Sequence, residues 1–238
     1  PEIKRQNAAD GVNELREVLG LQKVPSRIEA FDVSNISGTF AVAGMVAALN
    51  GVPQKNRYRR FRIKTVAGSD DPAMMAEVIR RRYERLAREN GEKPGLVLVD
   101  GGITQLNAAR RELKDLGLEE VPVAGLAKKY EELFWTDSLN PIRLKGDSKA
   151  LQVLQRLRDE AHRFALDYHH RLRSRKIRES VLDDIAGMGE KRKELLLRRF
   201  GSVKRIMSAS IDQLAEVPGI GYQMARLIKE TLGAVNGG

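Results

Sequence analysis

The chain has 238 residues, of which 42% are hydrophobic, and it contains no cysteine. This composition suits a globular protein with one large and one small domain, and it excludes disulfides, thiolate zinc sites and cysteine nucleophiles. Lysine and arginine together number 42 against 32 acidic residues, and the resulting net charge of +10 favours a polyanionic partner.

The sequence gives no sign of a membrane or secretory segment. Its longest apolar run, residues 40–49, is too short to span a bilayer and is better interpreted as a strand. We therefore expect no membrane partner and a cytoplasmic location. Because the chain begins at Pro1 without a methionine, we also expect it to be a fragment of a longer protein.

The N-terminal part predicts a helix followed by an antiparallel meander. Apolar residues recur at helical spacing over residues 8–19. Strands are predicted at residues 28–33, 39–49 and 58–65, and Asn50-Gly51 is a strong hairpin signal between the second and third. Short connections of this kind join consecutive antiparallel strands.

The pattern then changes to alternating helices and strands. A helix is predicted to start at Asp70-Asp71-Pro72 and to end at Asn90-Gly91. A buried strand at 96–99, a helix at 103–116 and a strand at 121–126 follow, which indicates a parallel half attached to the meander. We predict an α/β fold with a mixed five-stranded sheet and flanking helices. A loose hairpin at 133–135 and 141–144 and a long helix at 148–173 complete this part.

The last segment, residues 177–232, is helical, basic and internally duplicated. Two glycine-containing cores, at 185–189 and 217–221, each lie between short predicted helices, at 180–185 and 192–200 and at 211–215 and 224–231. We place the domain boundary near 174–178. The predicted division is an N-terminal helix and lead-in (1–25), a larger domain (26–174) and a small all-α domain (178–233).

Three polar residues stand against apolar backgrounds in the larger domain. Asp32 lies near the end of the first strand, Asp100 ends the fourth, and His162 belongs to a polar stripe on the long helix. If the two strands are neighbours, the carboxylates meet and repel each other unless a divalent cation neutralises them. Mg²⁺ or Mn²⁺ is the natural occupant and can activate water for phosphodiester cleavage. His162 could relay a proton, orient the water or bind the metal.

Each of these residues also has a structural interpretation. Asp32 and Asp100 could cap turns, and a histidine on a helix is more often structural than catalytic. The order of the elements nevertheless resembles the ribonuclease H fold, whose nuclease members hold metal ions at this position. Those members carry additional carboxylates where this chain has His162. The sequence leaves open whether one metal or two would bind.

The two glycine cores resemble a tandem helix-hairpin-helix module. Glycines let backbone N–H groups approach a phosphate closely, and a helix N-terminus adds its dipole. A helical bundle with glycine turns is the structural alternative. The predicted DNA-binding residues are four hairpin glycines and three nearby cations: Gly187, Gly189, Lys191, Arg192, Gly219, Gly221 and Arg226.

Together these features resemble the C-terminal half of the UvrC family, the incision subunits of bacterial nucleotide excision repair. The resemblance rests on Phe-Asp-Val-Ser-Asn at 31–35, Leu-Val-Asp-Gly-Gly at 98–102 with Gln105, Leu-Arg-Asp-Glu-Ala-His-Arg-Phe-Ala at 157–165, and the duplicated hairpins. It implies a metal-dependent endonuclease that cuts damaged double-stranded DNA on the 5′ side of the lesion. Asp32, Asp100 and His162 would form its catalytic triad, with Asp32 and Asp100 as metal ligands.

The same resemblance implies UvrB as a partner. The segment that binds UvrB, and the nuclease domain for the 3′ cut, would lie upstream of this chain, and we find neither here. A second hypothesis is a DNA-binding module on a nuclease-like scaffold without catalysis of its own. A junction nuclease of the same fold would require dimerisation, for which the sequence gives no sign, so we expect a monomer.

Overall fold

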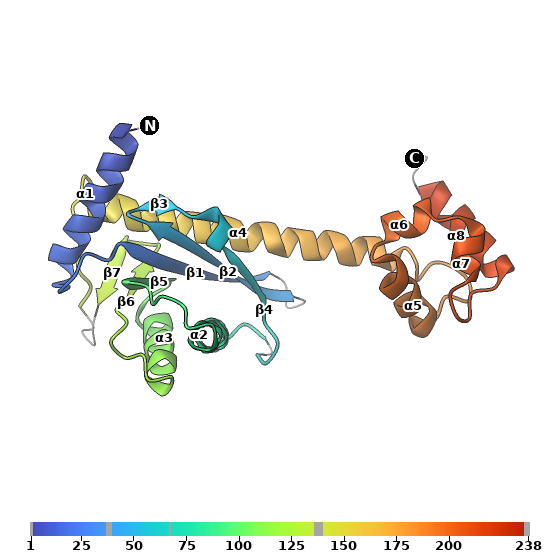
Figure 1. The fold of residues 1–238 in the computed structure, drawn as a ribbon, viewed down its shortest axis with the longest axis horizontal. Coiled ribbons are helices and arrows are strands. Elements are labelled where there is room, and N and C mark those ends of the chain that lie inside the picture. Colours follow the sequence, from blue (N-terminus) through green and yellow to red (C-terminus); the bar gives the residue numbers. More distant parts are fainter. Residues whose placement is uncertain (1, 37–39, 67, 136–139, 236–238) are drawn as a thin grey trace. The chain divides into compact units, whose positions relative to one another are not determined.

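The computed structural model describes residues 2–36, 40–66, 68–135 and 140–235. The chain forms two compact units, Pro1–His170 and Arg171–Gly238. Helix α4 (Lys149–Ser180) belongs to both units, since it continues past His170 (Figure 1). The finer predicted division, with its boundaries at 25 and at 174–178, stays a prediction. Within the described residues, no helix combines the length and the apolar character needed to cross a membrane.

A seven-stranded mixed sheet forms the centre of the first unit. The order of its strands is β3-β2-β1-β5-β6-β7, and β4 also pairs with β2. The strands are β1 (Arg27–Ile36), β2 (Phe40–Leu49), β3 (Val52–Pro53), β4 (Arg59–Arg62), β5 (Leu96–Asp100), β6 (Val123–Ala127) and β7 (Glu132–Trp135). β1 is antiparallel to β2 and parallel to β5, which is parallel to β6. The predicted α/β fold with a mixed sheet is confirmed.

The sheet has two more strands than the five predicted, because short pairings form at both of its edges. Asn50 and Gly51 have φ angles of 50° and 73°, as a tight hairpin turn requires, and they fold the chain back into β3. The chain then reaches β4 through the 3₁₀ turn η1 (Lys55–Arg57). At the other edge, β7 pairs with β6, and Leu133 also bridges to Ile142, where the loose hairpin was predicted.

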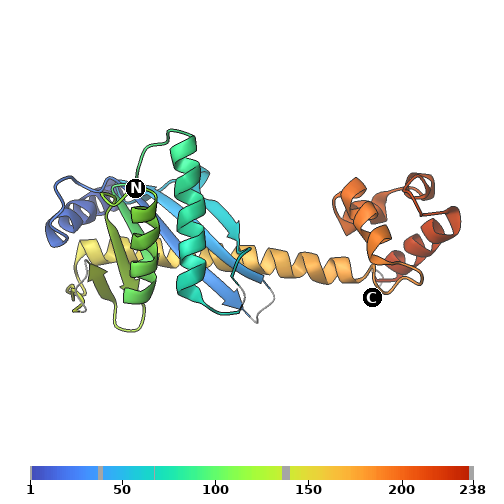
Figure 2. The same cartoon turned by 90° about the horizontal axis from the view of Figure 1, so that it is seen from below.

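Helices cover both faces of this sheet (Figures 1 and 2). Helix α1 (Glu2–Val18) and α4 pack on one face, while α2 (Asp71–Arg88) and α3 (Ile103–Asp115) pack on the other. Side chains of β1 alternate between these layers: Ile28 and Ala30 enter the core beside α4, and Phe31 enters the core beside α2. By this alternation Asp32 belongs to the α4 face, as the period of the strand predicts.

The second unit packs four further helices around a core of its own. They are α5 (Glu190–Phe200), α6 (Val203–Ser208), α7 (Ile211–Ala215) and α8 (Tyr222–Val235). The separate helix predicted at 180–185 is wrong. No glycine or proline interrupts the sequence from Lys149 to Ser180, so α4 extends to Ser180, and hydrogen-bonded turns follow it. Helix α6 was not predicted.

Candidate functional site

Asp32, Asp100 and His162 come together where the parallel pairing of β1 with β5 ends. β1 itself continues to Ile36, three residues beyond the strand predicted at 28–33. Phe31 of β1 pairs with Val99 of β5, and each aspartate follows directly in its strand. His162 reaches them from α4, where its Nδ1 lies 3.2 Å from Oδ2 of Asp32. One potential ligand atom from each of the three residues lies within 4.8 Å of the others. The structure therefore brings the predicted site residues of this unit into one cluster.

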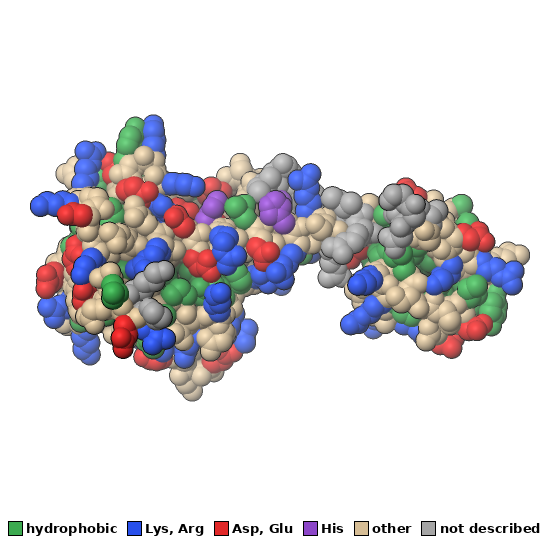
Figure 3. Space-filling view, turned by 90° about the horizontal axis from the view of Figure 1, so that it is seen from above, with side chains coloured by type: hydrophobic (Ala, Val, Ile, Leu, Met, Phe, Trp, Pro, Cys, Tyr) green, Lys and Arg blue, Asp and Glu red, His purple; other side chains and the backbone are tan. Residues whose placement is uncertain are grey.

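The residues of this cluster differ in their exposure to solvent. Asp32 is 4% exposed, whereas 41% of the His162 side chain is exposed. Figure 3 shows the α4 side of this unit, where histidine side chains lie at the surface among acidic and basic ones. A substrate can therefore reach His162 from solvent while the Asp32 carboxylate stays fixed beneath it.

Burial strongly perturbs the two carboxyl groups. It raises the pKa of Asp32 to about 8, and the negative charges of Asp100 and Asp71 act in the same direction. Burial also raises the pKa of Asp100, against the lowering effects of its hydrogen bond with Asp32 and of the positive charge on Arg158. Two negative charges are therefore unfavourable at this place unless a cation joins them.

Sequence reasoning missed three charged neighbours of this cluster. Arg158 is 5% exposed and binds Glu131 at 2.7 Å, while its positive charge acts on Asp100. It precedes His162 by one helical turn, a spacing that could have indicated a shared helix face. Lys128 follows β6, the neighbour of β5, and Asp71 begins α2; their charges act on Asp32. A rule that searches all strand ends and helix starts around the sheet would have found both.

The second unit holds the predicted hairpin glycines in two equivalent conformations. Gly187 and Gly219 have φ angles of 80° and 82°, which lie in the region that favours glycine. Gly189 precedes α5 and Gly221 precedes α8. A Cβ on Gly189 or Gly221 would meet no atom of the described chain within 4 Å. Space beside both backbones is thus open for close approach of a ligand.

The structure separates the roles of the three predicted cations. Arg192 donates hydrogen bonds to the carbonyl oxygens of Gly187 at 2.6 Å and of Gly219 at 2.9 Å, and so joins the two hairpins. Lys191 and Arg226 are exposed. A cavity of about 500 Å³ between the hairpins is lined by Lys191, Arg192 and three of the hairpin glycines, Gly187, Gly189 and Gly219. Among these three cations, Arg192 is the one whose side chain hydrogen-bonds to other described residues of the unit.

Comparison with known proteins assigns both units. Residues 16–166 match the family model of the UvrC RNAse H endonuclease domain. The chain belongs to the UvrC family. Residues 179–234 match the SAM-like helix-hairpin-helix tandem, as the duplicated glycine cores predict. The predicted family resemblance is therefore confirmed over both units.

Two curated UvrC relatives illustrate the extent of the match. UvrABC system protein C of Dehalococcoides mccartyi is 51% identical over 228 residues, which cover 94% of this chain and 38% of the relative. That of Methanosphaera stadtmanae is 47% identical over 226 residues, which cover 92% of this chain and 38% of the relative. The chain thus spans less than half the length of these UvrC proteins.

Solved structures resemble the chain more distantly. Endonuclease V of Ciona intestinalis, in complex with a DNA that contains inosine, is 17% identical with a TM-score of 0.35, and the match covers 65% of each chain. XPF from Aeropyrum pernix is 20% identical with a TM-score of 0.24, over 68% of this chain and 74% of that chain.

Proposed function

We propose that this chain is the part of a UvrC-type nuclease that cuts damaged DNA on the 5′ side of a lesion, by divalent-metal-dependent hydrolysis of a phosphodiester. The observation that carries this proposal is the convergence of Asp32, Asp100 and His162, with ligand atoms within 4.8 Å of one another. Membership of the UvrC family supports DNA as the substrate.

The donor set fits Mg²⁺ or Mn²⁺. Hard divalent cations prefer carboxylate oxygens. The buried Asp32 and the half-buried Asp100, both with raised pKa values, are stabilised as carboxylates when such a charge is placed between them. Asp32 and Asp100 would hold the ion. When bound, it supplies Lewis acidity that stabilises the charge developing on the phosphate and favours deprotonation of water.

His162 is the group that we assign to proton transfer. Its Nδ1 faces the Asp32 carboxylate at 3.2 Å, and this contact fixes the orientation of the ring. The other ring nitrogen, Nε2, remains to accept a proton from the attacking water or to return one to the leaving oxygen. The half-exposed position of the side chain gives it access to both.

The helix-hairpin-helix unit would bind the DNA backbone near the cut. The open space at Gly189 and Gly221 allows phosphate oxygens to reach backbone N–H groups, while exposed Lys191 and Arg226 add positive charge. Such contacts position the duplex without reading its sequence. We further propose that the chain acts as a monomer in the cytoplasm and that UvrB recruits it through a segment outside this chain.

The experiment that tests this function is nicking of a bubble duplex in Mn²⁺, with the Asp32→Asn variant beside the parent. We expect cutting by the parent, none by the variant, and none by the parent in EDTA. Cutting by both proteins would assign the activity elsewhere. If neither cuts while both bind DNA, the chain is either an enzyme that depends on its partner or a DNA-binding module on a nuclease-like scaffold. Titration with Mn²⁺ then decides, since only the enzyme should bind the ion through Asp32.

The role of His162 is tested by His162→Gln in the same assay. Because Asp32 and Asp100 remain, we expect Mn²⁺ affinity to change little while nicking falls by 10²-fold or more, as is usual for loss of a general acid–base group. If Mn²⁺ affinity falls as far as in Asp32→Asn, His162 is a metal ligand instead.

A further inference from the structure

An arginine-rich groove lies at the sheet edge formed by β4. It has a volume of about 280 Å³ and is lined by six arginines from β4 and α2, together with Phe61 and Glu84. β4 pairs with β2 alone among the described strands, so its outer edge is free of other strands. The site at Asp32, Asp100 and His162 uses none of these residues.

Some of these arginines already have carboxylate partners. Arg82 forms a two-pronged ion pair with buried Glu29, at 2.5 and 3.1 Å, and Arg60 binds Asp167 at 2.6 Å. Arg81 binds Glu77 at 2.8 Å and lies over the Phe61 ring at 5.6 Å. These three side chains shape the wall of the groove, and we do not assign them to a ligand.

The remaining three arginines carry the surplus charge. Arg59 hydrogen-bonds only to the backbone carbonyl oxygens of Asn56 and Tyr58, and Arg88 has no ion-pair partner within the described part of the chain. Arg85 pairs with Glu89, but both side chains are more than half exposed, at 59% and 54%, so water screens this pair. The groove is therefore lined by more guanidinium groups than carboxylates, and Arg59, Arg85 and Arg88 expose theirs to solvent.

The sheet register places the β4 edge of this groove two strands away from Asp32. Asp32 pairs with Gly44 of β2, and Gly44 pairs with Arg60 of β4, so these residues form one row across three strands. Two strand spacings amount to about 10 Å. Arg60 points to the α4 face, where it binds Asp167 and lies over the Phe164 ring at 4.4 Å, so Arg59 and the α2 arginines of the groove lie on the other face of the sheet.

We propose that the β4–α2 groove binds the phosphodiester backbone of the DNA, through Arg59, Arg85 and Arg88. The inference rests on the proposed function, which makes DNA the substrate. Positive charges clustered on one edge attract the regularly spaced phosphates of a nucleic-acid strand. Contacts here would hold the DNA on the nuclease unit, independently of the hairpin unit.

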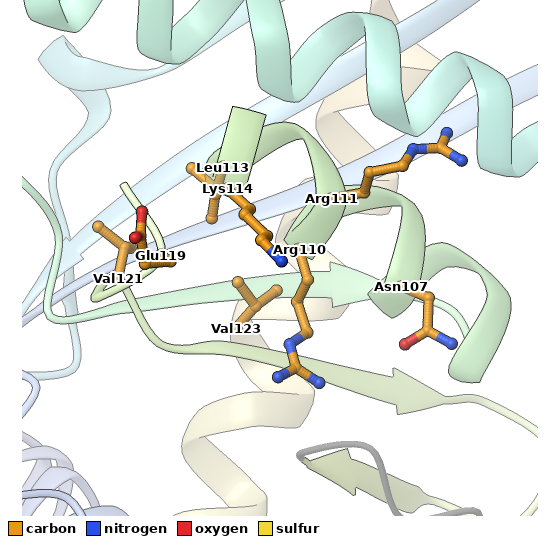
Figure 4. A pocket seen from close by; sticks show the side chains of 8 residues that line it. All are labelled: Asn107, Arg110, Arg111, Leu113, Lys114, Glu119, Val121 and Val123. Carbon is orange, nitrogen blue, oxygen red and sulfur yellow. The ribbon is translucent and has the colours of Figure 1, made fainter. Parts of the chain in front are cut away.

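A second basic pocket in the same unit provides a matched control. It has a volume of about 420 Å³ and carries Arg110, Arg111 and Lys114 of α3 (Figure 4). Arg110 and Lys114 project over β6 near Val123, whereas Arg111 extends away from them. Val123 begins β6 while Asp100 ends the parallel strand β5 beside it, so this pocket lies at the end of the sheet opposite the catalytic carboxylates.

The test compares triple variants of the full chain that lose the same number of charges. One carries Arg59→Gln, Arg85→Gln and Arg88→Gln, and the control carries Arg110→Gln, Arg111→Gln and Lys114→Gln. A third variant has lysine at positions 59, 85 and 88 and retains the charge. Binding to a fluorescent bubble duplex is titrated in EDTA, which prevents metal-dependent cutting, over a series of salt concentrations, and melting temperatures confirm folding.

We expect the groove variant to bind at least tenfold more weakly at about 0.1 M salt, and its slope of log K against log salt to fall by about two to three. The control should lose less than threefold, because screening limits charge effects at a distance. The lysine variant should bind nearly as tightly as the parent. Three results would overturn the proposal: equal losses of DNA affinity in the groove variant and the control, no loss of affinity in either, or a lysine variant that binds as weakly as the glutamine variant.

Nicking of the same duplex in Mn²⁺ separates this inference from the proposed function. If the parent binds through the groove but never nicks, the proposed activity is contradicted and the proposal that the groove binds DNA is supported. If the parent nicks, and the groove variant binds and nicks as well as the parent does, the proposal that the groove binds DNA is contradicted and the proposed activity is supported.

Discussion

Gly44 of β2 lies against the backbone of Ala165 in α4. A Cβ atom on Gly44 would come within 2.9 Å of the Ala165 backbone nitrogen and 3.0 Å of the Ala161 carbonyl oxygen. Real Cβ atoms essentially never approach backbone atoms so closely. The missing side chain therefore lets α4 lie directly on the sheet, and His162, between these two alanines, reaches Asp32.

We predict that Gly44→Ala impairs the site without touching any of its polar groups. The added methyl must push α4 away from the sheet, which separates His162 from Asp32 and costs about 1–3 kcal/mol of unfolding free energy. Chemical denaturation and nicking in Mn²⁺ measure the two effects. Gly146→Ala is the control, since a Cβ there meets no described atom within 4 Å. Normal nicking by Gly44→Ala would show that the contact does not position His162.

We predict that Asp100→Asn abolishes nicking, like Asp32→Asn, while DNA affinity stays within about threefold of the parent. The amide retains the volume of the carboxyl group but removes the charge that would hold the cation. Fluorescence titration in EDTA measures binding, and nicking in Mn²⁺ measures activity. A parallel loss of binding in both variants would assign the two aspartates to the structure of the unit rather than to its chemistry.

Local sequence patterns predicted those parts of the fold that depend on neighbours in the chain. The helix cap at Asp70, which accepts a hydrogen bond from the Ala73 N–H at 3.0 Å, and the turn at Asn50-Gly51 both follow from the preferences of a few adjacent residues. The short edge strand β3 was missed because two residues carry no periodic pattern, and only pairing with β2 defines it.

The residues of the candidate site likewise fall into two groups, those that local sequence patterns identify and those that only tertiary contacts define. Asp32 and Asp100 were found because each carboxylate follows an apolar stretch of a strand, while the pairing of β1 with β5 that brings them together was a condition of that prediction. Arg158 and Gly44 were missed. The role of Arg158 depends on Glu131 in a loop distant in sequence, and that of Gly44 on the approach of α4 to the sheet. Both are tertiary relationships; the one-turn spacing from His162 could have indicated the helix face of Arg158, whereas nothing local indicated the close approach at Gly44.

The raised pKa of Asp32 predicts how stability depends on pH without metal. Its folded-state pKa of about 8 lies above the unfolded value of about 3.9, so the folded state retains a proton that the unfolded state loses. This contribution is fully present below about pH 4 and is lost as pH rises towards 8, with a slope of up to about 1.4 kcal/mol per pH unit.

We therefore expect the unfolding free energy of the parent in EDTA to fall between pH 5 and 8 relative to that of Asp32→Asn. Urea denaturation at a series of pH values measures this difference. Saturating Mn²⁺ should abolish the decline in the parent, because the cation favours the ionised carboxylates, and should leave the variant nearly unchanged. Identical pH profiles for parent and variant in EDTA would contradict the shift.

Because Arg192 donates hydrogen bonds to both hairpins, we expect its replacement to cause a different defect from replacement of an exposed cation. Arg192→Ala removes donors to the carbonyl oxygens of Gly187 and Gly219, so the spacing of the hairpins is released. We expect this variant to melt at a lower temperature and to bind duplex DNA about tenfold more weakly. Lys191→Ala, its exposed neighbour, should keep the melting temperature and reduce the salt slope by about one.

Thermal melting and salt-dependent titration of the two variants distinguish a residue that holds the two hairpins together from a residue that contacts phosphate. Lysine at position 192 keeps the charge but cannot span two carbonyl oxygens with a planar fork, so Arg192→Lys should resemble the alanine variant. If Arg192→Lys instead restores both affinity and melting temperature, the charge of Arg192 matters rather than its bridge between Gly187 and Gly219. The hairpins would then hold their spacing through the apolar core of the unit alone, which includes Ile185 and Ile220.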